Sequence, residues 1–79
     1  MKETTIYRGK VTKLNEDISF VTLVDLANGK LTNDVPGDTR RLRQAGLQPG
    51  DEFEIVMLKT ETGAESIIRK TQSQLELNL

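Results

Sequence analysis

Carboxylates, lysines and arginines carry most of the chemistry open to this chain, because its 79 residues include no histidine and no cysteine. The usual general base, the thiolate nucleophile and the commonest metal ligands are therefore missing. Glu52 and Glu54, next to Asp51, show the alternate spacing of the solvent face of a half-buried strand. We therefore predict a protein that is not an enzyme, with no metal site, no cofactor and no small-molecule substrate.

Aromatic and basic residues in the N-terminal part of the chain suggest a binding chemistry instead. Phe20 lies in the segment ISFVTLVDL, and a ring on a strand can stack on a base. Neighbouring cations can neutralise phosphates, although the net charge of the chain is only −1. Packing of Phe20 under a loop and simple solvation of the cations are the alternatives. The predicted nucleic-acid-binding residues are Tyr7, Arg8, Lys10, Lys13, Phe20 and Lys30.

A secondary basic cluster consists of Arg40, Arg41 and Arg43 in a predicted short helix. With about 3.6 residues per turn, Arg40 and Arg43 share a side of this helix while Arg41 points elsewhere. The cluster is suited to phosphate or to an acidic protein, and a solvated helix face is the alternative.

Short strands account for most of the elements that must position these side chains. β-Branched and aromatic residues alternate in several segments, which favours strands. Gly9, at a change of apolar parity, predicts a bulge or a bend. Pro36 and Gly37 are expected to end the third strand, and Asp38 to cap the helix. The predicted strands are 4–14, 18–26, 30–35, 51–58 and 64–70, and the predicted helix is 39–45.

The order of these elements predicts the fold class. Five short strands, with one short helix between the third and the fourth, match a small all-β protein, a closed five-stranded Greek-key barrel of OB type. An SH3-like barrel is the alternative, and the inserted helix disfavours it. We expect one barrel domain over residues 1–70 and a C-terminal tail over 71–79. Leu75, Leu77 and Leu79 alternate in that tail, either as a strand that adds to a sheet edge or as a frayed end.

The segment GKVTKLNEDISFVTL resembles the first hairpin of the RNA-binding domain that is repeated in ribosomal protein S-one. The resemblance rests on Gly9, Val11, Phe20 and Val21, on the later turn NGKL, and on the Gly-Asp pair of LQPGDEF. The length of the chain is similar to that of bacterial translation initiation factor one, which has the same fold. The resemblance implies an OB barrel that stacks bases on Phe20, whereas Asp17 stands at the family's other aromatic position.

Two weaker likenesses compete with this one. The segment from Asn28 to Ile55 resembles the swapped-hairpin transcription regulators, with Pro36 and Arg40 at matching spacing. That resemblance implies a dimer that binds DNA through arginines. The pattern of glycine, Phe-Val, proline and Gly-Asp is also similar to small bacterial barrels of no assigned function.

We therefore expect a small, non-enzymatic module that binds single-stranded nucleic acid, with RNA favoured over DNA, by stacking and phosphate neutralisation. A protein-interaction module that uses the face of Ile18, Phe20 and Val24, or the leucine tail, is the main alternative. A dimeric DNA-binding regulator is a third possibility. Because no long apolar run and no N-terminal apolar segment are present, we expect a cytoplasmic protein without membrane contact.

Overall fold

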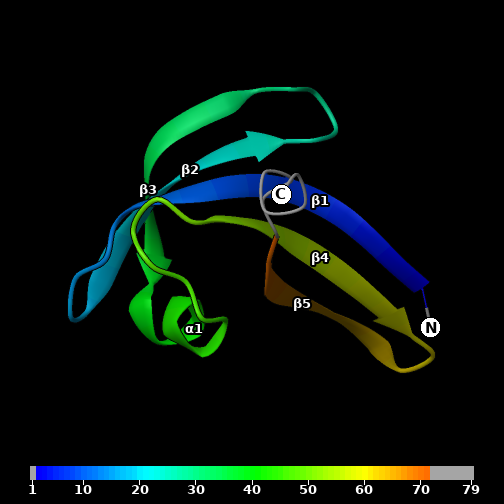
Figure 1. The fold of residues 1–79 in the computed structure, drawn as a ribbon. Coiled ribbons are helices and arrows are strands. Elements are labelled where there is room, and N and C mark those ends of the chain that lie inside the picture. Colours follow the sequence, from blue (N-terminus) through cyan, green and yellow to red (C-terminus); the bar gives the residue numbers. More distant parts are fainter. Residues whose placement is uncertain (1, 72–79) are drawn as a thin grey trace, which may run out of the picture.

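The computed structural model of the chain describes residues 2–71, and the leucines of the tail lie outside the described residues. The predicted number and order of elements are confirmed (Figure 1). Pro36 and Gly37 do not end the third strand, contrary to expectation, because an edge strand tolerates a proline that donates no hydrogen bond. The elements are β1 (Lys2–Lys13), β2 (Ile18–Asp25), β3 (Leu31–Asp38), α1 (Thr39–Gln44), β4 (Glu52–Thr60) and β5 (Gly63–Lys70).

The five strands form one antiparallel sheet in the order β3-β2-β1-β4-β5. The sheet is open among the described residues, whereas the sequence predicted a closed barrel. The physical reason lies between the edge strands β3 and β5, where α1 follows β3 directly and Arg41 Nη2 donates to the Ser66 carbonyl of β5 at 3.1 Å. The remaining space between β3 and β5 is an apolar cavity of about 200 Å³, which is lined by Val35 of β3 and Ile68 of β5.

The hydrophobic core lies on one face of the sheet, which we call the inner face. Its buried members are Val11 of β1, Val21 of β2 and Phe53 of β4, together with Leu42 of α1 and Leu47. On β4, Phe53 is fully buried, and Ile55 packs half-buried against the same cluster. The opposite face of the sheet is called the outer face.

Gly9 does not form the bulge that the sequence predicted. It is paired with Leu23 on one side and with Phe53 on the other. A Cβ atom added at Gly9 would lie only 2.5 Å from Phe53 Cζ and 2.8 Å from Leu23 Cδ2. The glycine is therefore required by the close approach of the buried ring, and β1 is instead irregular between Thr5 and Tyr7 and between Val11 and Lys13.

One buried residue, Val56, lies on the outer face, opposite Ile67 of β5. Arg69 forms two ion pairs. Its Nη2 lies 2.7 Å from Glu54 Oε1, and its Nη1 lies 3.4 Å from Glu3 Oε1. The residue pairs of Glu54 and Glu3 flank that of Val56, so the two ion pairs of Arg69 span the strand position of the valine. The hydrogen bond to Glu54 raises the pKa of the Arg69 guanidinium above its usual value.

The helix α1 is held at its start by Asp38, as the sequence predicts, and at its end by Gly46 and Leu47. Asp38 accepts a hydrogen bond from the Arg40 amide at 2.9 Å, which confirms the predicted N-cap. Gly46 has φ of 77°, and the Leu47 amide donates to the Leu42 carbonyl, so the chain leaves the helix through a left-handed glycine. The segment from Gly46 to Gly50 then leads the chain into β4.

Candidate nucleic-acid interface

Phe20 lies on the outer face of β2, between Lys13 of β1 and Pro36 of β3. It is half-buried, and the Thr12 hydroxyl donates to its carbonyl at 2.9 Å. Phe20, Thr12, Lys13 and Asp34 line a shallow cavity of about 340 Å³. The ring is thus part of a surface hollow that is large enough for a flat group.

Three of the predicted cations lie in one column on β1, on the same face as Phe20. Alternation places Arg8 and Lys10 on the outer face. Lys13 has the opposite parity, and the irregularity after Val11 brings it to the same face, because an extra residue in one strand shifts its register. The partners across the strand pair are Val24 for Arg8, Thr22 for Lys10 and Phe20 for Lys13.

Carboxylates flank this column of cations on both sides. On β4, Glu52 is paired with Lys10 and Glu54 with Arg8. On β3, Asp34 has φ of 56°, a left-handed conformation that aspartate adopts more readily than most residues, and it lines the cavity beside Phe20. Asp34 could not be recognised from the sequence, because its place depends on an irregularity in the β2–β3 pairing that no nearby residue indicates.

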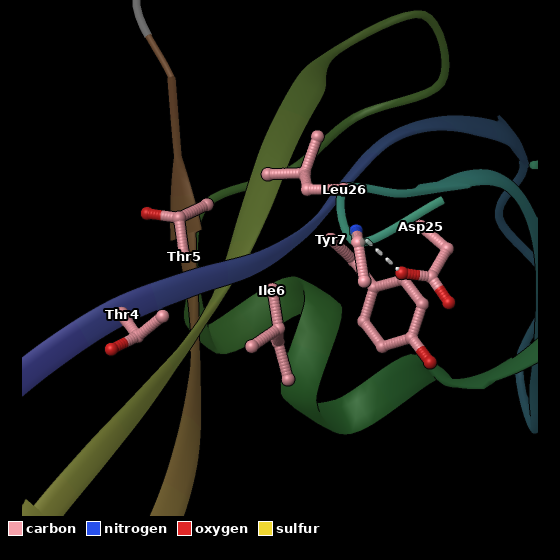
Figure 2. Close-up of a pocket in the computed structure, with 7 residues that line it drawn as sticks. Thr4, Thr5, Ile6, Tyr7, Asp25 and Leu26 are labelled. Carbon is pink, nitrogen blue, oxygen red and sulfur yellow. Dashed lines mark hydrogen bonds between the residues drawn. The ribbon is translucent and has the colours of Figure 1, made fainter. Parts of the chain in front are cut away.

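Tyr7 and Lys30 do not lie beside Phe20. Tyr7 is paired with Asp25 and Ile55, and the latter packs against the core, so the tyrosine ring belongs to the inner face. It lines a separate cavity at the end of β2 (Figure 2). Lys30 is exposed in the loop after β2, where its carbonyl accepts from the Asp25 amide at 2.9 Å. Asp25 is about five strand positions, or roughly 17 Å, from Phe20.

The arginine cluster of α1 is divided between two roles. Arg41 reaches across the open edge of the sheet to the Ser66 carbonyl and also lines the apolar cavity there. Arg40 and Arg43 are exposed. Because α1 packs on the inner face through Leu42, these arginines do not continue the column of cations on the outer face.

Apolar side chains extend the outer face beyond Phe20. Ile18 is 54% exposed at the start of β2, and Leu31 is 56% exposed at the start of β3. Val24 is half-buried and is paired with Leu31. The face of Ile18, Phe20 and Val24, which was expected as the alternative site for a protein partner, is therefore the same face that carries the cations.

Residues 2–71 contain no group of three or more acidic side chains close enough together to hold a metal ion. Within the same residues, no helix has the length and apolar character needed to cross a membrane. Comparison of the chain with protein-family models, with curated proteins and with solved structures found no match.

Proposed function

We propose that this protein is a small, non-enzymatic module that binds single-stranded RNA on the outer face of β1 and β2. The observation that carries the proposal is the convergence of Phe20, Lys13, Lys10 and Arg8 on that face. In this reading, one base stacks on the Phe20 ring in the hollow, and the cations of β1 contact the phosphates that follow.

The proposed fold type supports this location. We assign the sheet to the OB type, which is a partly open Greek-key barrel of five strands that binds oligonucleotides on its second and third strands. The strand order β3-β2-β1-β4-β5 and the helix between β3 and β4 agree with an OB barrel that is open between β3 and β5. The likeness of GKVTKLNEDISFVTL to the RNA-binding domain of ribosomal protein S-one also favours RNA.

The mechanism combines stacking with the release of counterions. If Arg8, Lys10 and Lys13 each neutralise one phosphate, the logarithm of the affinity falls with the logarithm of salt with a slope of about −2. This slope corresponds to about a 20-fold loss of affinity between 50 and 200 mM salt. The flanking carboxylates Glu52, Glu54 and Asp34 reduce the positive electrostatic potential away from the cations of β1. Binding therefore depends on direct contact with the phosphates more than on net charge.

Fluorescence anisotropy of a labelled pool of single-stranded RNA tests the proposal. The Phe20→Leu variant keeps the apolar volume but removes the ring, and we expect a loss of roughly 5- to 150-fold in affinity. Lys10→Gln is expected to lower the salt slope by about 0.7, and Lys59→Gln, an exposed lysine at the far end of β4, is the matched control that leaves it unchanged. Absence of binding at low salt would overturn the proposal.

A protein-interaction module is the second candidate, because Ile18 and Leu31 expose large apolar surface on the same face. A protein partner that packs on this face depends on apolar area, so Ile18→Ser and Leu31→Ser weaken it while Phe20→Leu is tolerated. An RNA partner shows the opposite order of effects. Measurement of RNA affinity and of self-association for these three variants separates the two functions.

A further inference from the structure

The largest cavity described so far lies at the end of β2, away from Phe20. Its volume is about 430 Å³, within the range of small-ligand sites. Its lining includes Ile6 and Tyr7 of β1 and Asp25, Leu26 and Ala27 at the end of β2 (Figure 2). The walls are mainly apolar, with one aromatic ring and one carboxylate.

The irregularity of β1 builds this cavity. The register shifts between Thr5 and Tyr7, so both Ile6 and Tyr7 lie opposite the single residue Ile55. Figure 2 shows the side chains of Ile6 and Tyr7 on the same side of β1, with Thr5 on the other. An apolar wall and a ring are thereby placed next to each other, which strict alternation along a strand does not allow.

Asp25 supplies the charged group of the cavity, which Thr4 and Thr5 also line. It is paired directly with Tyr7 in the sheet, so the two side chains leave the same face about 5 Å apart at their Cβ atoms. Asp25 Oδ1 accepts a hydrogen bond from the Ala27 amide at 2.9 Å, which fixes the orientation of the carboxylate. Among residues 2–71, the second oxygen Oδ2 takes part in none of the hydrogen bonds.

We propose that this cavity binds a guanine base of the RNA, an inference that rests on the function proposed above. The flat base lies against the Tyr7 ring and the apolar side chain of Ile6. Its Watson–Crick edge carries two adjacent N–H donors, N1–H and N2–H, which the Asp25 carboxylate accepts. Adenine and cytosine each pair a donor with an acceptor on that edge, and an acceptor facing the carboxylate is repelled.

The charges around the cavity favour a nucleotide over a cationic side chain. A guanidinium also presents two parallel donors to a carboxylate. Lys30, however, is joined to Asp25 through its backbone, whereas Arg8 lies on the outer face, away from the cavity. Lys30 disfavours a positively charged ligand and suits a phosphate that flanks the base. The proposal thus gives Tyr7 and Lys30 a role apart from the stacking hollow at Phe20.

The path of the RNA follows from the positions of the two sites. The Phe20 hollow and the Tyr7 cavity open on opposite faces of the sheet, about 17 Å apart along β2. The loop of residues 26–30 forms the rim between the outer face and the cavity, and Leu26 is 43% exposed on it. A strand of a few nucleotides therefore crosses this rim past Lys30.

The test uses the whole protein and oligouridine labelled for anisotropy, with one position near an end replaced by guanosine, inosine or adenosine. We expect the guanosine oligomer to bind about 10- to 100-fold more tightly than the adenosine oligomer. Inosine keeps N1–H and lacks the N2 amino group, so its oligomer is expected between the two. The same series is measured with Asp25→Asn, which keeps an oxygen acceptor for the Ala27 amide, and with the control Asp17→Asn in the exposed turn between β1 and β2.

Loss of the guanosine preference in Asp25→Asn, and its retention in Asp17→Asn, supports the inference. Equal affinity of the wild-type protein for the guanosine and adenosine oligomers overturns it, while binding of both leaves the proposed RNA-binding function in place. Binding of none of the oligomers overturns the function and the guanine site together. The inosine series uses the wild-type chain, so the inference stays testable if Asp25→Asn does not fold.

Discussion

Replacement of Gly9 by alanine perturbs the contact that joins the cation-bearing strand β1 to the core. The added methyl group would lie 2.5 Å from Phe53 Cζ and 2.9 Å from Phe53 Cε1. Phe53 is only 2% exposed and packs in the core, so a shift of its ring toward the apolar cavity that it lines gives up core contacts. Two effects oppose each other here, the overpacking of the ring and the better strand propensity of alanine.

The relative sizes of these two free-energy effects determine the net change in stability. Alanine in place of a strand glycine gains about 0.5–1 kcal/mol from the lower entropy of its unfolded state. Forcing an extra methyl group into a well-packed core costs about 1–3 kcal/mol, and contacts well below 3 Å belong to the upper part of that range. We expect a net loss of about 1–2 kcal/mol in the free energy of unfolding. For a domain of this size that corresponds to a fall in Tm of roughly 4–15 °C.

Thermal and urea unfolding, followed by far-ultraviolet circular dichroism, measure this loss. The matched control is the double variant Gly9→Ala/Phe53→Leu, in which the smaller side chain makes room for the methyl group. The two substitutions should couple, with the double variant about 1 kcal/mol more stable than the sum of the single losses predicts. If Gly9→Ala is as stable as the wild type, the packing of Phe53 on Gly9 is wrong.

Three further predictions concern single side chains. The Ser19 and Thr39 hydroxyls share a buried hydrogen bond of 2.6 Å, so Thr39→Val should cost about 1–3 kcal/mol in urea unfolding, while Thr39→Ser, which keeps the hydroxyl, should cost less. Asp38→Ala removes the N-cap of α1 and should lower stability by about 0.5–2 kcal/mol, whereas Asp38→Asn, whose side chain can still accept from the Arg40 amide, should be close to neutral in the same assay. Asp34→Asn removes a negative charge beside Phe20 and still permits the left-handed backbone, so RNA affinity in anisotropy should rise about threefold with stability unchanged; an unchanged affinity would place the RNA elsewhere.

The order of the elements could be predicted from the sequence because its signals are local. The β-branched segments, the Asn28-Gly29 turn and the Asp38 cap each act within a few residues, and Gly29 has the positive φ of 74° that such a turn uses. Whether the barrel closes could not be predicted from such local signals. It depends on whether β3 and β5 pair across the molecule, which no short stretch of sequence determines.

The candidate site was predictable in part for the same reason. Alternation along one strand is enough to put Arg8 and Lys10 on the same face. Lys13 joins them only through an irregularity in the strand pairing, whereas Tyr7 alternates with Arg8 and therefore lies on the inner face with Gly9 and Val11. The glycine at position 9 looked like the cause of the parity change, but its role is the close approach of Phe53. Strand irregularities depend on the partner strand, so a single sequence does not reveal where they fall.

The most direct test of RNA binding on the outer face is a titration of ¹⁵N-labelled protein with a short single-stranded RNA, followed by amide chemical shifts. We predict that the largest shifts fall on Lys10, Lys13, Phe20 and Thr22, which are neighbours on β1 and β2. The exposed amides of Glu61 and Thr62, in the turn between β4 and β5, should not move. Shifts confined to α1, or no shifts at low salt, would contradict the proposed interface.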